Sequence, residues 1–455
     1  MRRTPSALIF ALAIAVPFGA AFLKGEIPTS DAALFEYYGR AIDHGSRLYI
    51  DVWDNKLPSI YLANAVLQAL FGSYYRLHVL AEAAVAAASV ALFARLLVRS
   101  GVAAWGIASL ALAVLLTVLP LQIDSVENFA LPLMLLAFVL AGETAWGRVA
   151  AGVALALATT FWLPSLLLLL PLLDRERSVR GRVTLIATAG CTLLVYVGAM
   201  LAAFGMPAIA ELARSWVAYA NMSFAGRARA EGRFGVLVPI LTGLVRSGAG
   251  LLLASVAAVV RAPRDERERF ALIWSGSTLL GALALGNFYE HYFIPLLPAS
   301  IYTIAVFGTG RRVTVRRIAL GAVALYFVWR TVTFDAGAIP ASRADAHEKR
   351  LTAARVREVA GAGAVIDVDP YEPTIYLNAG AVGEDRFALV PRRIRPPAPP
   401  PPATAVVLTR FDADAERAFD ARLPTCARIG LNWRIQLLPN APAAVAARCR
   451  ASAAR

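Results

Sequence analysis

Long apolar stretches separated by short polar segments occupy the first 334 residues of the chain. A helix that crosses a bilayer needs about 20 apolar residues. Stretches that approach this length lie at 5–23, 77–98, 102–119, 128–145, 183–204, 236–260, 270–287, 291–309 and 317–334. A further stretch, 148–173, is too long for one span, and the turn at Pro164 divides it into two short tilted helices. The pattern predicts a polytopic α-helical membrane protein with about 11 transmembrane helices.

The composition agrees with this prediction. Of the 455 residues, 58% are hydrophobic and 17% are charged, and the mean hydropathy is +0.60. A soluble domain could not bury so much apolar surface. The net charge of +14 comes mostly from arginines beside apolar stretches. Such arginines are typical of topology signals and of contact with anionic lipids. We therefore expect membrane lipids as partners and no nucleic acid.

The segment 59–72 decides the predicted topology. At about fourteen residues it is short for a span. If it lies in the membrane interface, the basic loops fall on one side, as the positive-inside rule requires. Counting it as a span would move every basic loop after the first to the outside. The N-terminus is then cytoplasmic, and loops 24–58, 120–127 and 205–235 face outward with everything after residue 334.

Residues 335–455 predict a small α/β domain on the outer side. Ser342 is expected to cap a helix, with Asp345 three residues on, and Gly361 to end it. Two buried strands, a helix and a third strand are expected at 364–368, 405–409, 411–422 and 431–438. The expected domains are thus 1–334, a membrane domain with an interfacial first loop at 24–76, and 335–455.

The chain has three cysteines. Cys426 and Cys449 lie in the outer domain, where a disulfide and two unpaired thiols both fit the sequence. Cys191 lies within a predicted span and is expected to pack there. So few cysteines exclude a disulfide scaffold or a cysteine zinc site.

The most informative polar position follows the first apolar stretch. Apolar side chains from Leu34 to Ile42 recur at helical spacing and predict an amphipathic helix on the membrane, ended by Gly45. Asp31 lies at the start of this helix. Ser30 or Asp31 fits a helix cap with no further role. An outward carboxylate at the positive end of a helix can also act as a base.

Two outer loops carry further charged candidates. Asp51, Asp54 and Lys56 form a tight cluster, which is either a solvated turn or a contact for substrate or metal. Glu127 and Asn128 lie at the mouth of a span. Acids in two loops on one face fit a shared site, including one for a divalent metal with oxygen ligands. No histidine spacing supports zinc.

Two other outer segments add basic and aromatic candidates. Arg227 lies in the loop 205–235, outside the membrane against the positive-inside trend. A guanidinium suits phosphate binding, and contact with lipid headgroups is the alternative. Tyr289, His291 and Tyr292 lie between two spans, where aromatic side chains suit the membrane interface. His291 is either a satisfied interfacial residue or a substrate contact.

Several motifs carry a family resemblance. They are Ser30-Asp-Ala-Ala-Leu-Phe35, Leu48-Tyr-Ile-Asp-Val-Trp-Asp-Asn-Lys-Leu-Pro58, Ser125-Val-Glu-Asn128 and His291-Tyr-Phe-Ile-Pro-Leu-Leu-Pro298. Together they resemble the GT-C superfamily of membrane glycosyltransferases. The most similar branch is the bacterial family-39-type enzymes, related to protein O-mannosyltransferases and lipid A aminoarabinose transferases. The resemblance covers nearly the whole chain.

The resemblance implies sugar transfer, with inversion, from a polyprenyl-phosphate donor to an envelope lipid, glycan or protein. The location it implies is the bacterial inner membrane, with the active site and outer domain facing the periplasm. The first-loop aspartate of the family corresponds to Asp31, as general base, and the second-loop acid to Glu127. No cofactor is implied with certainty, and a divalent metal is one option. The alternative is a non-enzymatic transporter or flippase, which would place ionisable residues near the bilayer midplane.

The chain departs from the family pattern at two places. Many relatives have Asp-Glu where this chain has Asp31-Ala32. Many also have a lysine or arginine where it has Phe161-Trp-Leu-Pro164. The donor phosphate therefore needs another cationic or polar partner. The candidates are Lys56, Arg227 and His291.

Overall fold

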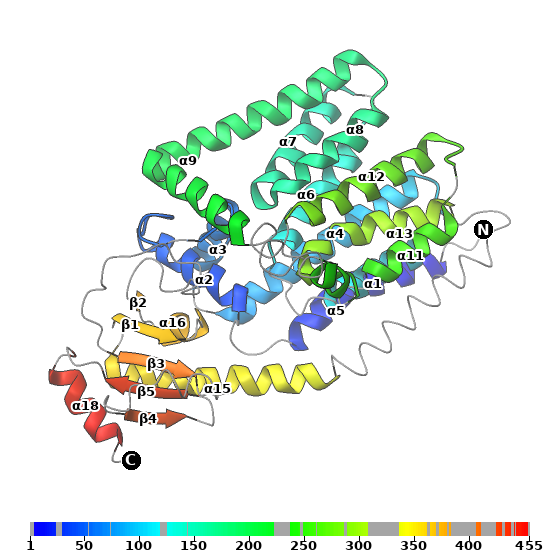
Figure 1. Ribbon diagram of the computed structural model, residues 1–455. Helices are drawn as coiled ribbons and strands as arrows, with labels where there is room; N and C mark the ends of the chain where they lie inside the picture. The colour runs from blue at the N-terminus through cyan, green and yellow to red at the C-terminus, as the bar shows by residue number, and fades with distance from the viewer. Residues whose placement is uncertain are drawn as a thin grey trace.

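The structure is a computed structural model of the 455-residue chain. It describes residues 4–23, 30–52, 54–72, 74–118, 125–142, 144–222, 237–245, 249–260, 262–285, 289–307, 336–361, 365–369, 373–379, 382–383, 406–410, 425–429, 433–437, 441 and 443–453. A large helical body is followed by a smaller part built on a β-sheet (Figure 1).

The helical body follows the apolar stretches of the sequence. Its elements are α1 (Thr4–Leu23), α2 (Ser30–Asp43), α3 (Pro58–Phe71), α4 (Tyr75–Arg99), α5 (Trp105–Val118), α6 (Val126–Leu140), α7 (Ala145–Phe161), η1 (Leu163–Leu168), α8 (Leu169–Arg175), α9 (Val179–Met222), α11 (Ala249–Val259), α12 (Glu266–Ala284), η2 (Glu290–Phe293) and α13 (Leu296–Phe307). A helix at Leu237–Val245 precedes α11. The predicted span 317–334 lies outside the described residues.

Two described helices, Tyr75–Arg99 and Val179–Val217, are long and apolar enough to cross a membrane. The stretch predicted as one span at 236–260 is instead two helices that bend by 87°. Most other apolar helices of the body have 10–17 residues, which is short for a span on its own. The number of membrane crossings, about 11, therefore stays a prediction.

Glycine and proline residues set the breaks in this body. The predicted division of 148–173 is confirmed, because α7 ends at Phe161 and a 3₁₀ turn carries Pro164. A Cβ at Gly281 would lie 2.9 Å from the Cβ of Pro164, so the glycine lets α12 approach this turn. The stretch predicted at 183–204 continues to Met222. It kinks at Gly205, whose φ of 81° is non-helical, just before Pro207.

Arginines join the helix ends at one end of the body. Arg148 pairs with Glu176 at 2.6 Å, and Arg269 pairs with Asp174 at 2.9 Å. Other contacts use backbone carbonyls at the ends of α4 and α6: Arg267 donates to Ser100 O and Arg99 donates to Val139 O. The acidic loop between α2 and α3 lies away from this end (Figure 1). This separation of basic and acidic loops fits the predicted topology, although which end faces outward remains a prediction.

The smaller part has a mixed five-stranded sheet with the order β2-β1-β3-β5-β4. Strand β3 pairs with β1 in parallel and with β5 antiparallel. The elements are α15 (Ala336–Ala360), β1 (Val365–Asp369), α16 (Pro373–Ala379), β2 (Val382–Gly383), β3 (Val406–Arg410), β4 (Thr425–Ile429), β5 (Trp433–Leu437) and α18 (Ala443–Ala453). The three predicted strands lie within a residue or two of β1, β3 and β5. The helix predicted near 411–422 lies outside the described residues.

The predicted start of the outer-domain helix is wrong. Helix α15 begins at Ala336, so Ser342 and Asp345 lie inside it and do not cap it. The residues before Ser342 include Gly337 and Pro340, which disfavour a helix, so the sequence did not indicate this earlier start. Its predicted end is correct, since Gly361 has a φ of +96° and donates its N–H to Arg357 O at 2.9 Å.

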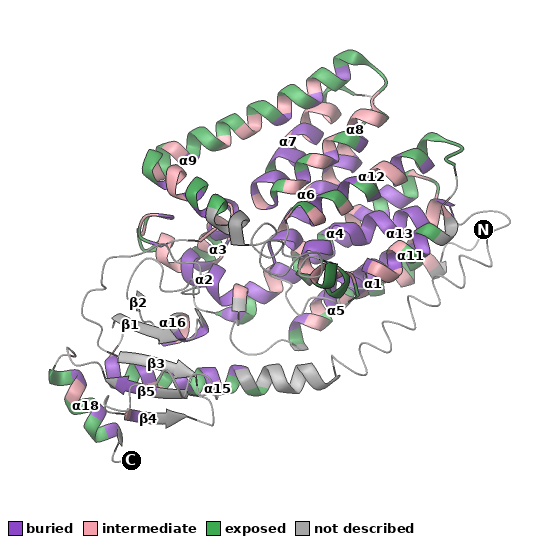
Figure 2. Ribbon diagram, viewed as in Figure 1, coloured by how far each residue is buried: buried purple, intermediate pink, exposed green. Residues whose placement is uncertain are grey.

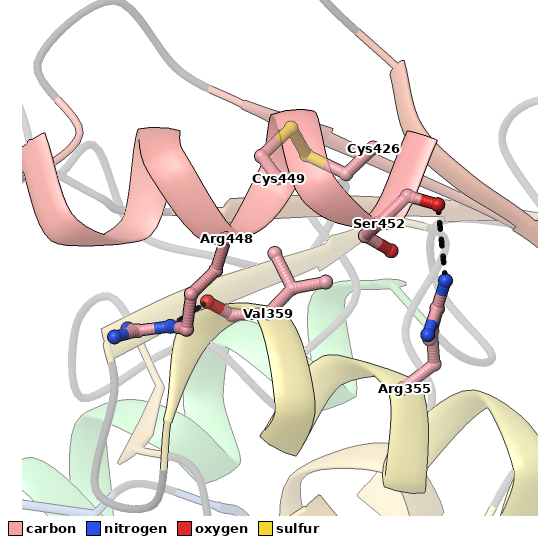
Figure 3. The surroundings of a disulfide bond; sticks show 6 residues. All are labelled: Arg355, Val359, Cys426, Arg448, Cys449 and Ser452. Carbon is pink, nitrogen blue, oxygen red and sulfur yellow. Dashed lines mark hydrogen bonds between the residues drawn. A yellow bond between two sulfur atoms is a disulfide. The ribbon is translucent and has the colours of Figure 1, made fainter. Parts of the chain in front are cut away.

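A disulfide between Cys426 and Cys449 joins β4 to α18 (Figure 3). Of the two alternatives that the sequence left open, the structure therefore has the bonded one. Arg448 donates to Val359 O and Ala360 O, at 2.7 and 2.9 Å, and so satisfies two carbonyls at the end of α15. The disulfide and this arginine attach the C-terminal helix to the rest of the domain.

The two parts meet where α16 packs against α2. Helix α3 covers another side of α2, and every residue from Ala32 to Gly39 is buried. The buried colour of α2 is visible in Figure 2. The sequence predicted an amphipathic helix with one polar face, and the structure corrects this. Its polar side chains have partners in other elements: Glu36 lies 3.8 Å from His78 of α4, and Arg40 donates to Leu377 O of α16.

Candidate functional site

Helix α2 places Asp31 in its first turn, where the side chain is half-buried. The helix crosses α3 at Gly39. A Cβ at that position would lie 2.6 Å from the backbone carbon of Asn64, so only glycine permits this approach. Phe35 and Tyr38 also pack on Tyr61 of α3, with ring centroids 5.9 and 5.4 Å away. These contacts set the position of α2, and with it the position of Asp31.

Two buried tyrosines hold the loop that follows. Tyr49 is fully buried with a φ of 66°, an uncommon conformation for a residue other than glycine. Its N–H donates to Val52 O, and its hydroxyl donates to Lys56 O at 2.5 Å. The Tyr61 hydroxyl donates to Asp54 Oδ2, also at 2.5 Å. The backbone of Lys56 and the carboxylate of Asp54 therefore have fixed positions.

Lys56 lies near two of the predicted acids, Asp54 and Glu127. Its charge acts on Asp54 and Glu127, and Asp31 adds a repulsive charge to both carboxylates. Burial raises the pKa of Asp54, while Lys56 and the Tyr61 hydrogen bond oppose this rise. Asp31, Asp54 and Glu127, from three separate segments, thus share one electrostatic environment.

Glu127 lies in the first turn of α6 and is fully buried. Within the described part of the chain, neither carboxylate oxygen makes a hydrogen bond of good geometry, although Ser125 lies close by. Asn128, beside it, is 2% exposed. Because burying an unpaired carboxylate is costly, the nearby Lys56 charge stabilises this arrangement.

Aromatic side chains around η2 form another side of the site. The Tyr292 ring centroid lies 5.8 Å from Lys56 Nζ, a cation–π distance. His291 stacks on Tyr289 at 5.6 Å and meets Tyr292 edge-on at 4.7 Å. Tyr289 is 47% exposed, so the aromatic group reaches from the half-buried Lys56 to the surface. Lys56 also acts electrostatically on His291.

One predicted site residue, Asp51, does not join this group. Asp51 is exposed, and its carboxylate accepts hydrogen bonds from the backbone and side chain of Arg47 at 2.7–3.2 Å. The structure therefore shows it as a turn residue, because its neighbour pairs with it locally. Arg227 lies outside the described residues.

The structure adds residues that the sequence analysis did not single out. Tyr49 and Tyr61 lie within or beside recognised motifs, but their hydroxyl contacts depend on the folded loop. Helix α9 covers the same loop from a distant part of the sequence: Trp216 Nε1 donates to Asn55 O at 2.9 Å. Only hydropathy identified that region beforehand. Among the described residues, no group of three or more histidine, cysteine or acidic side chains is arranged to hold a metal ion.

The succession of apolar helices, an acidic first loop and a terminal mixed sheet is the architecture that the family resemblance predicts. Two solved structures are similar to it, both of ArnT from Cupriavidus metallidurans. The one bound to undecaprenyl phosphate has a TM-score of 0.61 and 13% identity, covering 97% of this chain and 100% of the other. The apo structure has a TM-score of 0.57 and 14% identity, covering 94% and 97%. No protein-family model and no curated protein matches the sequence. The expected GT-C fold is confirmed.

Proposed function

We propose that this protein is an integral-membrane glycosyltransferase that moves a sugar from a polyprenyl-phosphate donor to an envelope lipid, glycan or protein. The observation that carries the proposal is the placement of Lys56 near Asp54 and Glu127, with Asp31 near both carboxylates, beside an aromatic group that reaches the surface. The likeness to an ArnT structure bound to undecaprenyl phosphate supports a polyprenyl-phosphate donor.

Lys56 is the proposed partner of the donor phosphate. An ammonium held among carboxylates and aromatic rings is poorly solvated, so a phosphate that reaches it gains a strong charge-assisted contact. Tyr289, His291 and Tyr292 offer hydroxyl, imidazole and ring surfaces beside it for the sugar. Arg227 remains a further proposed phosphate contact, and Asn128 a proposed sugar contact.

Asp31 is the proposed general base. It accepts the proton of the acceptor hydroxyl as that oxygen bonds to the anomeric carbon. The bond from this carbon to the phosphate oxygen breaks, and the polyprenyl phosphate leaves with the electron pair, stabilised by Lys56. Attack opposite the leaving group inverts the anomeric centre. The products are the glycosylated acceptor and polyprenyl phosphate.

The surroundings of the three carboxylates favour Asp31 for this role. Asp54 already accepts hydrogen bonds from Tyr61 and from the backbone N–H of Asn55. Glu127 is fully buried, whereas Asp31 is half-buried and can meet an acceptor that arrives from outside. Asp54 and Glu127 then keep Lys56 charged and in place.

The proposed setting is the outer face of the bacterial inner membrane. About 11 crossings would put the acidic loop and the outer domain on the periplasmic side, as the positive-inside rule requires. A lipid-linked donor would then reach the site laterally, already concentrated and oriented by the membrane.

A test can separate donor binding from transfer. Native mass spectrometry of the detergent-solubilised chain measures binding of undecaprenyl phosphate. Release of polyprenyl phosphate from a panel of polyprenyl-phosphate sugars, with envelope extract as acceptor, measures transfer. We expect Lys56→Met to weaken binding about tenfold or more, since contacts to a charged group contribute about 1.5–3 kcal/mol. Asp31→Asn should bind normally but transfer on the order of 10²-fold more slowly.

The matched control is Asp43→Asn, an exposed aspartate at the other end of α2. It should bind and transfer at the wild-type rate. Wild-type protein that binds undecaprenyl phosphate but transfers no sugar from any donor would overturn the proposal and favour a lipid transporter. Asparagine caps a helix about as well as aspartate, so a fully active Asp31→Asn protein would reduce Asp31 to a cap.

A further inference from the structure

We infer that Arg40 is a positioning residue through which the outer domain fixes the orientation of Asp31. The inference rests on the proposed function and adds a role for the domain that follows the membrane helices. The structural basis is one contact between the two parts: Arg40 Nη1 donates to Leu377 O at 2.8 Å.

The chemistry of both partners makes this contact specific. Leu377 lies in the last turn of α16, where backbone carbonyls have no partner within the helix. A guanidinium there satisfies a carbonyl and complements the negative end of the helix. The Arg40 guanidinium also lies over the Tyr37 ring, 5.6 Å from its centroid. Arg40 is therefore held from both sides, by its own helix and by the outer domain.

Charged groups from both parts of the chain surround Arg40. Glu36, one turn earlier on α2, attracts it, and Arg357 of α15 repels it. Glu36 also lies 3.8 Å from His78 of α4, so α2 contacts a further helix beside the Arg40 contact.

Helix α2 connects this contact to the active site. Asp31 and Arg40 are nine residues apart, which corresponds to about 13 Å along the helix and to nearly opposite faces. All residues between them are buried, so the helix moves as one rod. Helix α3 fixes where α2 crosses, at Gly39. The contact with α16, on another side, opposes rotation of α2 about its own axis, and such rotation would turn Asp31 away from the acceptor.

The test compares Arg40→Met with two other variants of the full-length protein. Arg40→Met should lower kcat for sugar transfer about tenfold while KM for the lipid donor changes less than twofold, because misplacement of a catalytic group mainly affects the chemical step. Arg40→Lys keeps a charged donor and should recover at least half of the rate. Arg47→Met is the matched control, because Arg47 is exposed and pairs with Asp51 of its own loop. It should leave kcat unchanged.

A double-mutant cycle distinguishes positioning from general damage. If Arg40 acts through Asp31, Arg40→Met should have no further effect in the Asp31→Asn background. An equal tenfold loss in both backgrounds, or a loss that Lys does not recover, would overturn the inference. So would a normal kcat for Arg40→Met when Asp31→Asn is impaired. A fully active Asp31→Asn protein would instead contradict the proposed general base, so the two failures are distinguishable.

Discussion

The hydrogen bond from Tyr61 to Asp54 gives the sharpest test of the site's electrostatics. Tyr61→Phe removes one hydroxyl and keeps the ring that packs on Phe35 and Tyr38. A hydrogen bond to a charged group contributes about 1.5–3 kcal/mol, and we expect about 1–2 kcal/mol here because Asp54 is only partly buried. For a body of this size, this corresponds to a fall in Tm of about 1–3 °C.

The loss should depend on pH. Burial raises the pKa of Asp54, and the Tyr61 hydrogen bond counteracts part of that rise. Without the hydroxyl the folded-state pKa rises further, so the folded protein holds the Asp54 proton more tightly than the unfolded chain does. Ionisation of Asp54 then costs more stability as the pH rises above about 4, its ordinary range. We expect the Tm difference between Tyr61→Phe and wild type to be larger at pH 8 than at pH 5.

The measurement is thermal unfolding in one detergent at both pH values. Tyr302→Phe is the matched control, because the Tyr302 hydroxyl donates to the neutral Ser100 hydroxyl at 2.7 Å. Its Tm loss should be the same at pH 5 and pH 8. An equal loss at both values for Tyr61→Phe would show that Asp54 keeps the same charge at both, and the electrostatic reasoning would then fail.

Three further outcomes are expected. Tyr49→Phe removes the hydrogen bond to Lys56 O and should weaken undecaprenyl phosphate binding about fivefold, as for a neutral hydrogen bond of about 1 kcal/mol; wild-type affinity would contradict this role. Cys449→Ser opens the disulfide, which should cost the outer domain about 3 kcal/mol, seen as earlier protease cleavage than in wild type. A reporter active only outside the cytoplasm should be active when fused after residue 340 and silent at 178, and the reverse would invert the topology.

The sequence predicted the helices of the body because each must be apolar along most of its length. It failed where a partner decides the conformation. The polar residues of α2 indicated a helix with one solvent-exposed face, but Glu36 meets His78 of α4 and Arg40 meets α16. In the same way, α9 continues past Gly205, because Pro207 is tolerated in the first turn of the helix that resumes after the kink.

In the candidate site too, local sequence predicted some residues, and contacts made only in the folded chain decided the others. Lys56, Glu127 and the aromatic residues near His291 were identified from charge and position in loops, and the structure brings them together. Asp51 has the same charge and nearly the same position in sequence as Asp54, yet the two lie in different environments. Sequence spacing could not separate them, because Arg47 pairs with one and Tyr61 with the other.

The division of labour in the site follows from these environments. A group that moves a proton must reach both the acceptor and water, whereas a group that holds a cation works best when water is excluded. In the proposed mechanism Asp31 meets the first requirement, and Glu127, which lies near Lys56, meets the second. The helix that carries Asp31 is buried between a membrane-domain helix and the outer domain. Its orientation therefore depends on both parts of the chain, and this is the route by which we propose that the C-terminal domain influences the transfer.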